Sequence, residues 1–190
     1  MQGYHGTTRT FKAFDRQADP VSGSMTSHLG VFLSASPEIA AHFTLKPEVL
    51  DAGYDSLEGS RSLIQNPWRY DRQPFLSNAH VLTVAFELNH PHRFDAISWM
   101  TLVDDFQGGA GAQTHFEQMR QQWLEEGYDG LIIEAWDGHS TDADGIRPSV
   151  EMDAVTYVIF QPERAQILER RSAETCWTPK PKQPRRTGLR

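Results

Sequence analysis

The residues best suited to chemistry lie in short segments far apart in the chain. His5, Gly6 and Thr7 place an imidazole and a hydroxyl beside a glycine, whose lack of a side chain lets another molecule approach the backbone closely. Phe32 and Phe43 stand eleven residues apart. Their rings could stack a flat aromatic group, and the polar groups could orient its substituents. Each residue also has an ordinary structural explanation, since a phenylalanine in a helix usually packs into the core.

A second group of candidates lies near the carboxyl end of the chain. Thr156 opens a run with strong β propensity, and Glu151 and Asp153 stand just before it. A threonine can hydrogen-bond a hydroxyl, but it cannot act as a base at neutral pH, whereas a carboxylate can. Ser34 offers a further hydroxyl after Phe32.

The elements that position these residues show no regular strand–helix–strand alternation. Helices are predicted over residues 37–45 after an N-cap at Ser36, over 95–106, and over 114–126 after an N-cap at Thr114. A turn is predicted at residues 89–91 and a hairpin loop over 137–152, and residues 129–130 are read as a simple turn before a strand. Strands are predicted over residues 2–7, 30–34, 79–88, 131–133, 155–160 and 165–168. This order favours the α+β class over a doubly wound sheet.

The length of 190 residues indicates one domain, predicted over residues 1–171, followed by a tail. Residues 172–190 are basic and rich in proline, which is typical of disorder. Residues 46–78 lack periodicity and are interpreted as a long loop that serves as a lid or a partner-binding insertion.

Composition excludes several classes of function. The net charge of −7 argues against a broad nucleic-acid-binding face, because phosphate contacts need a cationic surface. Cys176 is the only cysteine, so no intrachain disulfide or cysteine metal cluster can form, and the spacing of the histidines predicts no metal site. No apolar run is long enough to span a bilayer, and no membrane partner is expected. No leader with basic and apolar regions precedes residue 2, so we expect a cytoplasmic protein or one delivered into a target cell by another system.

Three groups of segments, taken together, resemble the ADP-ribosyltransferase superfamily, in the His-Tyr-Glu branch that includes diphtheria toxin and the poly-ADP-ribose polymerases. The similarity is to compact bacterial and phage domains, and it covers about residues 2–168. It implies split antiparallel β-sheets with a few peripheral helices. The segments are Tyr4-His5-Gly6-Thr7-Thr8; Gly30-Val31-Phe32-Leu33-Ser34 with Ala40-Ala41-His42-Phe43; and Tyr128-Asp129-Gly130 with Thr156-Tyr157-Val158-Ile159-Phe160-Gln161-Pro162 and Gln166-Ile167.

The resemblance implies that NAD is the co-substrate and that no metal takes part. Nicotinamide is a flat ring with a carboxamide, so Phe32 and Phe43 would stack it and the backbone of Gly6 would bind the amide. His5 would hydrogen-bond a ribose hydroxyl, and Thr7 or Ser34 could add another contact. The implied activity is mono-ADP-ribosylation of a protein or nucleic-acid acceptor with release of nicotinamide.

The sequence departs from the family pattern at two catalytic positions. Phe32 stands where the branch usually has tyrosine, and Thr156 stands where it has the catalytic glutamate. The implied catalytic set is therefore His5, Phe32 and Thr156, with Glu151 or Asp153 as a displaced carboxylate. Three possibilities stay open: a displaced carboxylate, assistance by the substrate, or an inactive NAD or ADP-ribose binder.

Two further readings share the fold. One is a catalytically silent interaction module, and the other is an RNA 2′-phosphotransferase, for which Arg9 and Arg147 are the nearest arginines by motif. A toxin or effector of this superfamily would also imply an inhibitor or immunity protein as partner.

Overall fold

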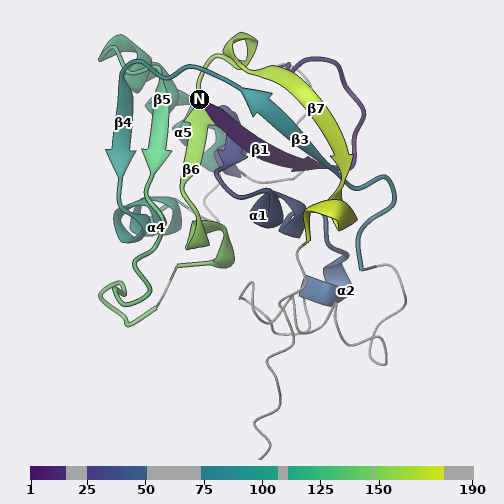
Figure 1. Cartoon of the computed structure of the whole chain (residues 1–190). Coiled ribbons are helices and arrows are strands. Elements are labelled where there is room, and N and C mark those ends of the chain that lie inside the picture. The colour runs from purple at the N-terminus through teal and green to yellow at the C-terminus, as the bar shows by residue number, and fades with distance from the viewer. Residues whose placement is uncertain (16–24, 51–73, 107–110, 147, 178–190) are drawn as a thin grey trace, which may run out of the picture.

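Seven strands form one sheet in the part of the chain that the computed structural model describes, residues 1–15, 25–50, 74–106, 111–146 and 148–177 (Figure 1). Their order is β4-β5-β6-β2-β1-β3-β7, and every pair is antiparallel except the parallel pair β4–β5. The strands are β1 Gln2–Thr7, β2 Val31–Ser34, β3 His80–Ala85, β4 Pro91–Phe94, β5 Gly130–Ile133, β6 Thr156–Ile159 and β7 Gln166–Ser172. The predicted α+β class is confirmed.

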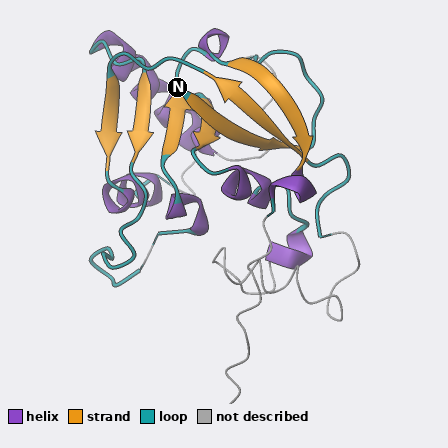
Figure 2. Cartoon of the chain, viewed as in Figure 1, coloured by secondary structure: helices purple, strands orange, loops and turns teal. Residues whose placement is uncertain are grey.

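The helices are short and lie around the sheet (Figure 2). The α-helices are α1 Pro37–His42, α2 Pro47–Leu50, α4 Ala96–Asp104 and α5 Ala112–Glu125. The 3-10 helices are η1 Met25–His28, η2 Val150–Asp153, η3 Pro162–Arg164 and η4 Ala173–Cys176.

Of the two predicted N-caps, Ser36 has the expected chemistry and Thr114 was placed wrongly, while Asp95 is a cap that was not predicted. Ser36 accepts a hydrogen bond from the Ile39 amide at 3.3 Å, and Asp95 accepts one from the Ser98 amide at 2.8 Å. Helix α5 does not begin at Thr114, because its N-cap is Gly111, a left-handed residue with φ of 106° that provides no side-chain cap. Glycine adopts that conformation without strain, so the chain can enter the helix earlier than the threonine suggested.

The sheet is almost divided between β1 and β2. β1 pairs with β3 along its whole length, but with β2 it forms the single pair Tyr4↔Ser34. In Figure 1, β4, β5 and β6 run side by side, whereas β1, β3 and β7 cross the view at a slant. The sheet therefore consists of a half-sheet β4-β5-β6-β2 and a half-sheet β1-β3-β7, joined at one residue pair.

Apolar side chains cover both faces. On one face, α4 and α5 pack aromatic residues against the first half-sheet, and α1 lies over β1. On the other face, a second cluster extends across both half-sheets. The first cluster includes Trp99, Phe116, Trp123, Leu131, Ile133 and Val158, and the second includes Val31, Leu33, Leu82, Val84 and Ile159.

Two edge strands differ from the predictions. Pro91–Phe94, which begins at the last residue of the predicted turn over residues 89–91, is strand β4, because a proline is tolerated at the first position of an edge strand. β7 continues to Ser172, well past the predicted end at residue 168. Glu169, Arg170 and Arg171 are charged, so this part of the sequence lacks the apolar alternation that predicts a strand. An edge strand nevertheless tolerates charge on its exposed positions.

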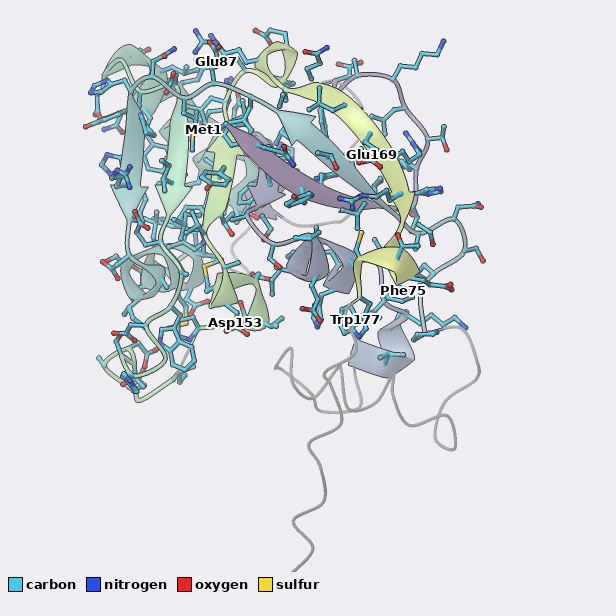
Figure 3. The ribbon with its side chains drawn as sticks, viewed as in Figure 1. Met1, Phe75, Glu87, Asp153, Glu169 and Trp177 are labelled. Carbon is cyan, nitrogen blue, oxygen red and sulfur yellow. The ribbon has the colours of Figure 1, made fainter. Side chains whose placement is uncertain are left out.

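The folded part of the chain also extends into the predicted tail. Ala173, Cys176 and Trp177 are buried, and the Trp177 ring meets the Phe75 ring edge-on at 5.9 Å (Figure 3). The predicted boundary at residue 171 is therefore too early, because these apolar side chains complete a core cluster with α1. Residues 178–190 and most of the predicted lid, residues 51–73, lie outside the described residues, whereas Leu45, just before the predicted lid, forms an isolated bridge with Phe75 near its other end.

Asp129 does more than form a turn before β5. Its carboxylate accepts hydrogen bonds from the Asn89 amide at 2.7 Å and the His90 amide at 3.1 Å, and it pairs with Arg164 at 3.1 Å. The side chain is buried, so it fixes the connection between β3 and β4.

Replacing Asp129 by alanine should lower the free energy of unfolding by about 2 kcal/mol, because two backbone donors lose a charged acceptor. Urea unfolding measures the loss. The control is Arg164→Ala, which removes only a partly exposed ion pair and should cost less than about 1 kcal/mol. Equal losses in the two variants would show that the ion pair, and not the capped amides, carries the effect.

Candidate functional site

The backbone of Gly6 points into the region where β1 and β2 separate. The Met1 amino group donates to the Phe86 carbonyl and the Phe86 amide to the Met1 carbonyl, at 2.7 and 3.2 Å. Residues of an antiparallel strand direct their polar groups to alternate sides, so His5 bonds toward β3 and Gly6 toward β2. In the register of Tyr4↔Ser34, Gly6 would face Phe32, but these two described residues form no ladder pair.

The backbone polar groups of β2 also point to alternate sides along the strand. The Ala35 amide donates to the Val155 carbonyl at 2.8 Å, so Phe32 and Ser34 direct their backbone groups toward β1. We call this region the β1–β2 opening. It presents the N–H and C=O of Gly6 opposite the N–H of Phe32.

Gly6 has a second role beside α1. A Cβ atom at this position would lie 1.9 Å from the Ala40 carbonyl oxygen and 3.2 Å from the Thr44 methyl group. Only glycine therefore lets α1 lie so close to β1. On the face toward α1, a glycine is required at this position for close packing. On the strand edge toward β2, the N–H and C=O of Gly6 form no ladder pair with Phe32.

His5 connects the two strands across the opening. Its Nδ1 lies 3.0 Å from the Phe32 carbonyl oxygen. A carbonyl only accepts, so Nδ1 carries the proton and Nε2 is left as an acceptor. Burial lowers the pKa of His5, although the bond to the Phe32 carbonyl opposes the shift. The imidazole is therefore neutral at physiological pH.

Phe11 and Phe14, which were not among the predicted site residues, lie against His5. The His5 ring meets Phe14 edge-on at 5.2 Å and Phe11 at 6.4 Å. Their spacing of three residues just after β1 was the available signal. Thr7, on the same face, accepts a hydrogen bond from the Arg9 amide at 3.1 Å, so its hydroxyl is engaged in a local turn.

Phe32, Ser34 and Thr156 share the opposite face of the sheet. Ser34 and Thr156 are directly paired, and Phe32 lies two residues along the same strand. Both hydroxyl residues are buried, at 6% and 7% exposure. The Ser34 hydroxyl accepts from the Ser36 amide at 3.1 Å. The Phe32 ring lies 6.3 Å from the Trp99 ring, so part of this ring belongs to the core.

Phe43 lies at the end of α1, next to the Thr44 that touches the Gly6 position. Its side chain is 55% exposed. Phe43 therefore does not pack into the core, as a phenylalanine in a helix usually does. Its ring meets the buried His42 edge-on at 6.4 Å, and burial lowers the pKa of His42. The Phe43 ring is therefore exposed, contacts a buried neighbour on one side, and is available to stack against a ligand.

Glu151 and Asp153 lie on η2, which packs against α1 just before β6. The predicted loop over residues 137–152 is thus partly helical at its end. Burial raises the pKa of Glu151, against a hydrogen bond from Ser149 that lowers it. Asp153 is exposed (Figure 3). Glu151 is therefore the desolvated carboxyl of the two.

Six of the predicted residues thus lie on the strands around the β1–β2 opening, but on different sides of it. Gly6 forms its edge, His5 and Thr7 lie on one face, and Phe32, Ser34 and Thr156 lie on the other. Within the described ranges, no group of three or more acidic, histidine or cysteine side chains is placed to hold a metal ion. Among those same residues, no helix is both long and apolar enough to cross a bilayer.

No family model matches the chain, and neither a curated protein nor a solved structure matches it significantly.

Proposed function

We propose that this chain binds NAD at the β1–β2 opening and transfers ADP-ribose to an acceptor, releasing nicotinamide. The observation that carries the proposal is the edge of Gly6, where an N–H and a C=O point toward β2 but form no ladder pair with that strand. A carboxamide has one acceptor and two donor hydrogens, so one donor and one acceptor on adjacent backbone atoms can hold it in a single orientation.

The surrounding side chains support the same ligand. Phe43 is exposed at the end of α1, and an aromatic ring there can stack a flat nicotinamide. Nε2 of the neutral His5 can accept a hydrogen bond from a ribose hydroxyl. The split antiparallel sheet of an ADP-ribosyltransferase is consistent with two half-sheets that meet at Tyr4↔Ser34 alone.

In the proposed reaction, the bond between the ribose C1′ and the nicotinamide nitrogen breaks, and its electron pair leaves with nicotinamide. A lone pair of the acceptor forms the new bond to C1′, and the acceptor's proton passes to a base. Positive charge develops on the ribose, so a nearby carboxylate would stabilise it. We assign this role to Glu151, because a desolvated carboxylate interacts more strongly with a cation than an exposed one does.

Phe43→Ala should weaken NAD binding about fivefold while leaving the melting temperature unchanged, because stacking contributes about 1 kcal/mol and the side chain is mostly exposed. Isothermal titration calorimetry measures the affinity. Leu168→Ala is the matched control, since Leu168 is equally exposed at 55% but lies on β7. Unchanged affinity in Phe43→Ala would remove Phe43 from the site, and absence of NAD binding by the wild-type chain would refute the proposal.

A second candidate function follows from Thr156, which is buried beside Ser34 where a carboxylate would otherwise stand. A silent module of the same fold would bind NAD or ADP-ribose without turnover. Nicotinamide release and labelling of an acceptor from radiolabelled NAD separate the two functions. Binding with no release under any condition favours the module.

A further inference from the structure

The segment that follows β1 folds over the outer face of His5. We call residues 8–15 the cover segment. Its two phenylalanines touch the imidazole, and their own rings meet edge-on at 5.2 Å. Arg9, Lys12 and Asp15, the charged residues of the cover segment, are exposed, whereas Phe11 and Phe14 place aromatic rings against His5.

One side chain from the far end of the sequence holds the cover segment. Arg170 donates from Nη1 to the Arg9 carbonyl and to the Thr10 hydroxyl, both at 3.3 Å. From Nη2 it donates to the Phe11 carbonyl at 2.9 Å. Three donor contacts use the fork geometry of a guanidinium, which lysine cannot reproduce.

The register explains why this arginine reaches the segment. His5 is paired with Leu82 on β3, and Leu82 is paired with Arg170 on β7. Residues paired across a sheet share a face, so His5 and Arg170 lie in one row with a buried leucine between them. From this row the guanidinium reaches the Phe11 carbonyl, and the Phe11 ring meets the imidazole.

We propose that Arg170 is a positioning residue for His5. It ties the cover segment to β7, and the segment in turn confines the imidazole so that Nδ1–H stays on the Phe32 carbonyl and Nε2 stays available to a ligand. The consequence for catalysis rests on the proposed function, whereas the restraint of His5 is a property of the free protein.

The test observes His5 in the full chain without NAD. Long-range ¹H–¹⁵N spectra report the tautomer and the pKa of each histidine, and His5→Asn identifies the His5 signals by their loss. We expect the Nδ1–H tautomer in the wild type. Arg170→Met keeps the apolar stem of the side chain but no donor. In this variant we expect a second tautomer and a pKa that moves up toward the ordinary value, because the cover segment loosens and water reaches the ring.

Arg171→Met is the matched control. Arg171 is the next residue of β7, and its Nη2 contacts the Thr83 hydroxyl at 3.4 Å on the other face. The His5 spectrum should not change in this variant. Arg170→Lys has one compact donor group and should give a tautomer ratio and a pKa of His5 between those of the wild type and Arg170→Met. If Arg170→Met does not fold, Arg170→Lys replaces it in the test. A wild-type His5 spectrum in the Arg170 variants would overturn the proposal.

Catalytic measurements then separate this inference from the proposed function. If the chain releases nicotinamide, Arg170→Met should lower kcat about tenfold through misplacement of His5, and Arg171→Met should not. If the His5 spectrum changes as expected but no variant, nor the wild type, shows activity, the restraint stands and the transferase function fails.

Discussion

Gly6→Ala is expected to lower the free energy of unfolding by about 3 kcal/mol, and with it the melting temperature by about 6 to 12 °C. The added Cβ would lie 1.9 Å from the Ala40 carbonyl oxygen, which belongs to the backbone of α1 and cannot move without displacing the helix. Thermal and urea unfolding, followed by circular dichroism, measure the loss.

Gly3→Ala provides the matched control, because it makes the same change in the same strand. A Cβ at Gly3 would meet the Leu33 Cβ at 3.0 Å, the Phe86 ring at 3.2 Å and the Ser34 carbonyl oxygen at 3.4 Å, so a shift of a few tenths of an ångström is enough to relieve these contacts. We expect a cost of at most about 1 kcal/mol. Adding Ala40→Gly to Gly6→Ala should not restore stability, because the clash is with a carbonyl oxygen. Equal stability of the Gly3 and Gly6 variants would contradict the close contact between β1 and α1.

Glu151→Gln is expected to lower the rate of nicotinamide release about a hundredfold, if the chain is the transferase we propose, because the amide keeps the shape of the side chain but removes its charge. The wild-type rate should also fall at low pH. The carboxylate must be ionised, and burial raises the pKa of Glu151, so activity is lost as the pH drops through that raised value. The Glu151→Gln variant should lack this acidic limb.

Asp153→Asn is the control for this assignment, since Asp153 lies on the same 3-10 helix but is exposed. It should retain most of the activity. The opposite result, with Asp153→Asn inactive and Glu151→Gln active, would reassign the carboxylate. If neither substitution changes the rate, the chain uses neither group. A gain of NAD hydrolysis in Thr156→Glu would then show that the site binds NAD but lacks its carboxylate.

Much of the fold could be predicted because the elements next to the site carry strong local signals. β1 occupies the predicted residues 2–7, and α1 begins after Ser36 as the capping pattern indicates. β4 and the end of β7 could not be predicted in this way. Their pairing partners lie far away in the sequence, and strands at a sheet edge have too few buried positions to show alternation.

The sequence predicted which residues belong to the candidate site, but not how the sheet arranges them in space. The sequence pointed to His5, Gly6, Phe32 and Thr156 through their order and a family resemblance. It could not show that the sheet places His5 and Phe32 on opposite faces, because that depends on the register between strands. Arg170 also escaped notice, because its contacts join residues about 160 positions apart and leave no local pattern.

The half-sheet β1-β3-β7 takes its strands from the start, the middle and the end of the chain. During synthesis on the ribosome, β1 and β3 can pair as soon as residue 85 has emerged, but the outer edge of β3 stays open until β7 follows. Such long-range pairing is slow, and an open strand edge attracts other chains. We therefore expect the nascent protein to depend on chaperones until β7 is complete, and the β1–β2 opening to reach its final shape only after Arg170 has been translated.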